Sequence, residues 1–165
     1  MSQARDQWDV ADPQETLDAI IARSHPADGD VIVAMLRSQD GGAREIVDVT
    51  VVHPAGQPIE QLTARDRLRR HAQSTAPSGL WKRGKARTVD HVFVTVVCRS
   101  GRVLPGPTEL FWSLAWRYSN HLTDAFFGDI YILTPHGWTG VHDRRAGFTP
   151  ALTKPSDIRV LRQVL

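Results

Sequence analysis

Four short runs of β-branched and aromatic residues constrain the fold of this chain more than any other feature. They cover residues 31–36, 46–52, 91–98 and 129–134, and turn residues bound most of them. Apolar runs of this length are typical of strands rather than helices. The turn signal Asp40-Gly41-Gly42 separates the first two runs by too few residues for a crossover. We therefore expect these two strands to pair antiparallel.

Two helices with clear boundaries are expected around these strands. Asp12 as N-cap, with Pro13 at the first helical position, predicts a helix that ends near residue 24. A longer apolar stripe with helical spacing predicts a helix from Thr108 to about Phe127, which Gly128 ends. Both stripes are wide enough to cover a sheet, so both helices are expected to pack on the core.

A third helix has a different character. Thr63 as N-cap and Asp66 three residues later form a capping-box pattern, and the helix is expected to run towards Gln73. Only Leu68 and Ala72 supply an apolar face. We therefore expect this basic helix to lie at the periphery, outside the core.

A chain of 165 residues fits one ordinary domain. We expect a flexible leader over residues 1–11 and a single α+β domain over residues 12–165. Its sheet is expected to be mainly antiparallel, with five or six strands, two packing helices and one peripheral basic helix. A hairpin through Ser100-Gly101 into residues 102–104 and a last short strand at residues 158–161 complete the expectation.

One internal similarity stands out along the chain. Val49-Thr-Val-Val-His-Pro-Ala-Gly56 and Val94-Thr-Val-Val-Cys-Arg-Ser-Gly101 match in five of eight places. The expected helix starts Thr63 and Thr108 stand at the same 45-residue offset. An ancient duplication of a strand–strand–helix unit would explain both facts. They would also be explained if unrelated hairpins simply use the same types of residue. The sequence leaves the two explanations open.

The composition excludes several kinds of site. Cys98 is the only cysteine, so neither an intramolecular disulfide nor a multi-cysteine zinc site can form. It ends a strand-like run, which favours a small buried hydrophobe over a reactive thiolate. The chain also lacks a His-Glu-x-x-His motif, a Gly-x-Ser-x-Gly motif and a glycine-rich phosphate loop. We therefore expect no metal and no cofactor.

The hydrophobic segments predict no association with a membrane. The longest apolar run, residues 31–36, is far shorter than the ~20 residues that a membrane-spanning helix needs. The first eight residues lack the apolar stretch of a signal peptide. The expected location is the cytoplasm.

The charges are distributed unevenly. The net charge is +2, but residues 65–87 hold eight Lys or Arg residues and one acid, which gives this segment +7 and leaves −5 for the rest. Such clusters attract phosphate backbones, and an exposed tryptophan can stack on an unpaired base. We therefore expect nucleic acid or another polyanion as a partner. The alternative is a solvated surface in an arginine-rich chain. The residues predicted to bind are Arg65, Arg67, Arg69, Arg70, Trp81, Lys82, Arg83, Lys85 and Arg87.

A second hypothesis makes the protein a small hydrolase. His136 lies in a Pro-His-Gly turn after a predicted strand, where a rigid scaffold presents reactive side chains. A histidine and a carboxylate at such a place can perform general acid–base catalysis. The predicted catalytic set is His136 with His121, Asp124 or Asp143. The alternative reading of each residue is an ordinary surface or hydrogen-bonded group.

A third hypothesis makes the protein a homodimeric interaction module. Trp112 and Trp116 stand one turn apart at the border between the apolar and polar faces of the longest predicted helix, and Trp138 follows the histidine turn. Large amphipathic rings at such borders often mark subunit contacts. The alternative places all three rings in the core.

Overall fold

The computed structural model describes residues 10–38, 44–76, 91–119 and 125–154. These residues form helices α1 (Pro13–Ser24), α2 (Gln61–Thr75) and α3 (Pro107–Arg117). They also form strands β1 (Val31–Ser38), β2 (Arg44–His53), β3 (His91–Cys98), β4 (Ala125–Thr134), β5 (Gly137–Gly140) and β6 (Ala146–Gly147). The predicted strand at residues 158–161 lies outside the described residues.

The six strands form one mixed sheet in the order β2-β1-β3-β4-β5-β6. All neighbouring strands pair antiparallel except β3 and β4, which are parallel and joined through α3. This arrangement confirms the predicted α+β fold with a mainly antiparallel sheet. The antiparallel pairing of the first two strands is also confirmed.

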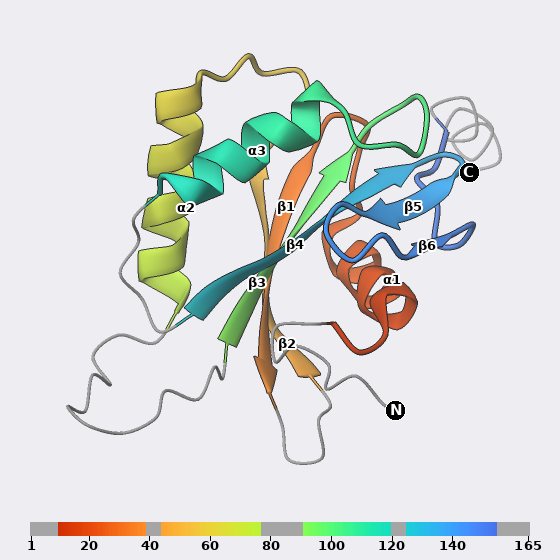
Figure 1. The fold of residues 1–165 in the computed structure, drawn as a ribbon, viewed down its shortest axis with the longest axis horizontal. Coiled ribbons are helices and arrows are strands. Elements are labelled where there is room, and N and C mark those ends of the chain that lie inside the picture. The colour runs from red at the N-terminus through yellow and green to blue at the C-terminus, as the bar shows by residue number, and fades with distance from the viewer. Residues whose placement is uncertain (1–9, 39–43, 77–90, 120–124, 155–165) are drawn as a thin grey trace, which may run out of the picture.

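The sheet is covered on both faces (Figure 1). Val31, Val33 and Met35 of β1 point to the face that α2 and α3 cover, and the alternate residues point to α1. The sheet therefore separates two apolar clusters, one beneath α2 and α3 and one beneath α1. This two-sided burial explains why the sequence of β1 is a continuous apolar run.

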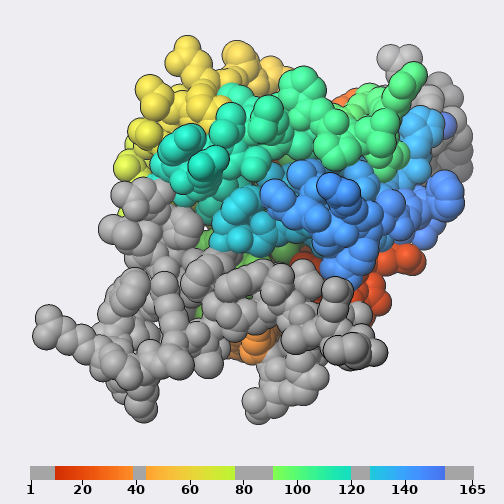
Figure 2. Space-filling view, viewed as in Figure 1, coloured from red at the N-terminus to blue at the C-terminus, as the bar shows by residue number. Residues whose placement is uncertain are grey.

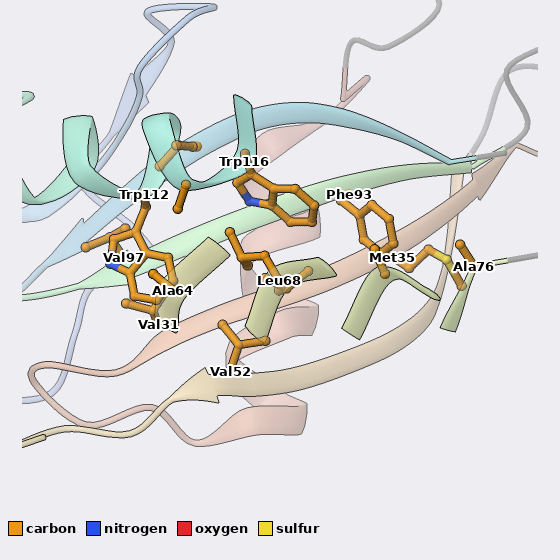
Figure 3. Close-up of a cluster of buried hydrophobic side chains, with 14 residues drawn as sticks. Val31, Met35, Val52, Ala64, Leu68, Ala76, Phe93, Val97, Trp112 and Trp116 are labelled. Atoms are coloured by element: carbon orange, nitrogen blue, oxygen red, sulfur yellow. The ribbon is translucent and has the colours of Figure 1, made fainter. Parts of the chain in front are cut away.

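Helix α2 is part of the core, so the prediction of a peripheral helix is wrong. Ala64, Leu68 and Ala72 have no exposed surface and pack above β1 and β2 (Figure 3). Two of these three residues are alanines, whose small side chains let the helix lie close to the strands. A count of large apolar residues therefore understates how firmly α2 is held.

The predicted long helix after residue 108 is wrong beyond Arg117. Helix α3 ends there, and residues 125–127 belong to β4, where they pair with residues 91–93 of β3. The pattern favoured a helix because aromatic residues recur at helical spacing. Pairing with β3 instead supplies the backbone hydrogen bonds of this segment.

The boundary of the predicted leader also differs from the structure. Val10 is buried in the cluster beneath α1, and the guanidinium of Arg145 donates to the carbonyl oxygens of Val10 and Ala11. Residues 1–9 lie outside the described residues. The chain is therefore docked at least two residues before the predicted domain start.

The two similar segments occupy equivalent places in the fold. Strand β2 ends at His53 and β3 ends at Cys98, which stand 45 residues apart. Gly56 and Gly101 follow, both with positive φ angles of 79° and 98°. Each turn then leads to a helix on the same face of the sheet, where α2 and α3 lie side by side (Figure 2).

Candidate functional site

A pocket of about 470 Å³ opens where β2 and β3 end, β1 begins and α3 begins. It lies between the two equivalent turns. Its walls are mostly apolar, and they include Val31, Ile59, Val97, Pro107, Phe111 and Trp112. Its polar lining comes from His53, Arg99 and Thr108.

The guanidinium of Arg99 organises the loop beside this pocket. Its Nε donates to Oε1 of Glu109 at 2.7 Å, and Nη2 lies 3.4 Å from Oε2 of the same carboxylate. The remaining donors bind the carbonyl oxygens of Ser100, Arg102 and Leu104. All five N–H groups are thereby used, so none is left for a ligand. The predicted hairpin at residues 102–104 is wrong, because these carbonyl groups bind Arg99 instead of a strand.

Glu109 completes this arrangement from the first turn of α3. Its side chain is 1% exposed, and Oε2 also accepts from the N–H of Gly106 at 2.7 Å. A buried carboxylate needs both an opposite charge and hydrogen bonds. Arg99 supplies the charge, so the pair adds no net charge to the pocket.

His53, the last residue of β2, lines the pocket. Burial lowers the pKa of its imidazole, and a neighbouring guanidinium, that of Arg67, acts in the same direction. Nδ1 of His53 lies 3.1 Å from Nη1 of Arg67. Because a guanidinium can only donate, Nδ1 must accept, and the ring is neutral with its proton on the other nitrogen.

Trp112 differs from the other two buried tryptophans of the described chain. The indole N–H of Trp116 donates to Oγ1 of Thr95, and that of Trp138 donates to the carbonyl oxygen of Thr149. Trp112 is 2% exposed as a residue, and its N–H donates to no described residue but keeps some contact with solvent. Figure 3 shows its nitrogen at the edge of the ring nearest Val97, another residue of the pocket wall.

The arginines of α2 have different surroundings. Arg67 points towards the sheet, where Nη1 donates to the carbonyl oxygen of Val52 at 3.0 Å and contacts His53. Arg69 forms an ion pair with Asp66 at 3.0 Å on the surface. Arg65 is half-buried and Arg70 is exposed. The predicted binding residues Trp81, Lys82, Arg83, Lys85 and Arg87 lie outside the described residues.

The described members of the predicted catalytic set lie apart. His136 is exposed in the turn between β4 and β5. Asp143 follows the other end of β5 and accepts from the hydroxyl of Tyr131 and from Arg145. The strand between them covers roughly 10 Å, so the two side chains cannot act on one reacting atom. His121 and Asp124 lie outside the described residues.

Asp143 belongs instead to a network with Asp129. The carboxylate of Asp129 accepts from the N–H groups of Ile130, His142 and Asp143. Burial raises the pKa of Asp129, and the charge of Asp143 adds to this increase. These contacts close the turn after β5. Within the described ranges, no group of three His, Cys, Asp or Glu side chains could hold a metal ion.

The three predicted interface tryptophans are core residues. Trp112, Trp116 and Trp138 are only 2%, 3% and 4% exposed within a single chain. Trp116 stacks on Phe93 and Phe127, and Trp138 packs against Tyr131 on the other face of the sheet. The interface hypothesis for these rings is therefore corrected, because buried rings present no surface to a second chain.

Sequence reasoning missed the pocket. Residues 29, 53, 59, 108 and 111 line it, and none carries a familiar motif. The one available signal was the 45-residue similarity, whose two turns meet at this place. Cys98 also lies here and is buried as predicted, and burial raises the pKa of its thiol to about 12.

No protein-family model, no curated protein and no solved structure matches this chain. Among the described residues, no helix is both long and apolar enough to cross a bilayer. The function must therefore be argued from the residues themselves.

Proposed function

We propose that this protein binds a polyanion, with nucleic acid as the partner, through α2 and the basic segment that follows it. The observation that carries the proposal is the separation of charge along the chain. Residues 65–87 hold +7, whereas the remaining residues hold −5. A phosphate backbone is attracted to the first region and repelled by the second, which favours one orientation on the partner.

Helix α2 holds its arginine side chains on a firmly packed backbone. Its buried stripe of Ala64, Leu68 and Ala72 holds one side against the sheet. Arg65 and Arg70 form no ion pair with any residue that the structure describes. Arg70 also lines a hollow of about 290 Å³, together with Thr63, Asp66 and Arg67. Two cations on a firmly packed helix can bind phosphates without a large loss of conformational entropy.

The two other arginines of α2 contribute differently. Arg69 is held by Asp66 in an exposed pair, and such pairs are weak enough to open for a phosphate. Arg67 is committed to Val52 and His53, so it is removed from the binding set. The binding residues proposed here are therefore Arg65, Arg69, Arg70, Trp81, Lys82, Arg83, Lys85 and Arg87.

The hydrolase hypothesis lacks comparable support. It requires side chains that converge on one reacting atom. His136 and Asp143 lie at opposite ends of β5 instead. The concentration of positive charge in residues 65–87 therefore favours binding over catalysis as the function of this chain.

A titration tests the proposal. Fluorescently labelled single-stranded and duplex DNA of about 20 nucleotides is titrated with the protein at 50 and 200 mM salt, roughly the range over which phosphate contacts lose most of their affinity. The expected result is binding at low salt that weakens at least tenfold at high salt. The variant Lys82→Gln/Arg83→Gln/Lys85→Gln/Arg87→Gln is expected to bind weakly at both. Lack of binding at low salt, or unchanged binding by this variant, would contradict the proposal.

A further inference from the structure

The pocket between the two equivalent turns carries an inference that is independent of polyanion binding. We propose that it binds a small, uncharged, apolar molecule that carries a hydrogen-bond acceptor of the carbonyl type. Three observations define this ligand class: the apolar walls, the saturated polar groups and two N–H groups without acceptors.

The size and walls of the pocket set the body of the ligand. Its volume of about 470 Å³ falls within the usual range of small-molecule sites. Phe111 and Trp112 stand edge to face with ring centres 5.5 Å apart, and the ring of His53 lies 5.8 Å from that of Trp112. An aromatic or compact aliphatic body can therefore pack against three rings.

The charged groups at the pocket are already occupied. Arg99 uses every donor on Glu109 and on three carbonyl oxygens. His53 accepts from Arg67 and is hydrogen-bonded to the backbone of Gln57. A ligand that needed a counter-ion would have to break one of these arrangements, so the pocket favours an uncharged molecule.

Two donors remain available. The indole N–H of Trp112 has no acceptor among the described residues, although its ring is 98% buried. The N–H of Thr108 stands in the first turn of α3, where the helix offers no acceptor, and Thr108 also lines the pocket. Both N–H groups have contact with solvent, so an acceptor on a ligand replaces water there and gains the net effect of one hydrogen bond.

The surrounding charges exclude a carboxylate as that acceptor. Asp28 and Asp30 flank Gly29 in the pocket wall, and each binds the N–H of a residue in one of the two turns. With Glu109 they outnumber the guanidinium groups of Arg67 and Arg99. The partial positive charge at the start of α3 is about half an elementary charge and does not reverse this balance. A neutral carbonyl oxygen fits the donors without this repulsion.

Nuclear magnetic resonance of the ¹⁵N-labelled protein tests the proposal with three probes of similar size. Acetophenone carries the acceptor, ethylbenzene lacks it, and benzoate carries it as an anion. The signal of the Trp112 indole is assigned from its loss in Trp112→Phe. Acetophenone is expected to shift this signal downfield and to saturate. Ethylbenzene is expected to bind about threefold to tenfold more weakly, which is the effect of one hydrogen bond. Benzoate is also expected to bind more weakly than acetophenone, because the surrounding carboxylates repel its charge.

The variants sharpen the interpretation. Trp112→Phe keeps a ring and removes the donor, so it should reduce the affinity for acetophenone to that for ethylbenzene. Trp138→Phe is the matched control, because it removes a paired indole N–H on the opposite face. Absence of any shift at concentrations on the order of 10 mM, equal binding of ethylbenzene, or tighter binding of benzoate would each overturn the proposal. The comparison of the three probes uses the wild-type chain, and Trp112→Phe enters it only for the assignment of the indole signal.

Discussion

The unit formed by β2 and α2 and the unit formed by β3 and α3 share one geometry and differ in how their arginines are paired. In both, a strand ends, a glycine with positive φ turns the chain, and a helix returns over the same face. Asp30 accepts from the N–H of Ala55, and Asp28 accepts from that of Ser100, which is 45 residues later. The residues before β1 therefore hold both turns in the same way.

The difference between the units lies in where their arginines are directed. The β2–α2 unit holds Arg65 half-buried and Arg70 exposed, both without a described ion-pair partner, and turns Arg67 towards a neutral histidine. The β3–α3 unit instead places Arg99 against a buried carboxylate within its own loop. One backbone plan thus leaves Arg65 and Arg70 without an ion pair among the described residues in the first unit and forms a closed ion pair in the second. A pocket forms where the two turns meet.

The largest expected difference between the units concerns Arg99 and Arg67. Arg99→Met leaves the Glu109 carboxylate buried without an opposite charge, which should lower the free energy of unfolding by about 3–5 kcal/mol. Arg67→Met removes hydrogen bonds to a carbonyl oxygen and a neutral ring, at a cost of about 1–2 kcal/mol. Urea denaturation measures both values. Equal losses would show that the two arginines are equivalent.

The next largest effect tests whether α2 is as firmly held as α3. Leu68→Ala should lower the free energy of unfolding by about 2–4 kcal/mol, because the side chain of Leu68 is completely buried between α2 and the sheet. Leu62→Ala on the same helix is the control, since that side chain is 62% exposed and should change stability by less than about 0.5 kcal/mol. A loss below about 1 kcal/mol for Leu68→Ala, roughly that of a surface substitution, would show that α2 is only loosely attached to the core.

Much of the β structure could be predicted because its signals are local. The run 91–98 coincides with β3, and the cap at Asp12 accepts from the N–H of Glu15 as expected. The loop around Arg99 could not be predicted, because its form depends on a contact with Glu109 ten residues away in the first turn of another element. The end of α3 was missed for a related reason, since pairing with β3 decides where β4 begins.

The candidate site was less predictable than the fold. The +7 segment is visible in the sequence, but the inward turn of Arg67 is not, because it follows from the position of α2 over β2. The sequence marked Trp112 together with Trp116 and Trp138 as interface candidates, with the core as the alternative, and the structure shows the core position. The ring of Trp112 is buried and only its N–H remains without a partner, which no spacing pattern reveals.

A smaller effect compares the two aspartates that hold the turns. Asp30→Ala and Asp28→Ala each remove acceptors for two donors and should each lower the free energy of unfolding by about 1–2 kcal/mol. Thermal denaturation of the two variants in the same buffer checks this expectation. A large loss for one variant and no loss for the other would show that the two turns are held differently.

The smallest expected effect is a pH dependence that arises from two histidines of the first unit. Burial lowers the pKa of both His53 and His71 from 6.5, so the unfolded chain binds more protons at these sites. Their contribution to stability is complete above pH 6.5 and decreases as the pH falls below it. His53→Gln should flatten the fall in unfolding free energy between about pH 7 and pH 5. His136→Gln, an exposed control, should leave the wild-type slope unchanged.

The salt dependence of DNA binding tests the central claim about Arg65 and Arg70 of α2 most directly. Arg65→Gln/Arg70→Gln is compared with Arg102→Gln/Lys154→Gln, which removes the same charge from exposed sites outside the β2–α2 unit. The slope of log affinity against log salt concentration is negative, and the account predicts that its magnitude decreases by about two for the first variant only. Identical slopes for the two variants, or no binding by the wild-type protein at low salt, would contradict it.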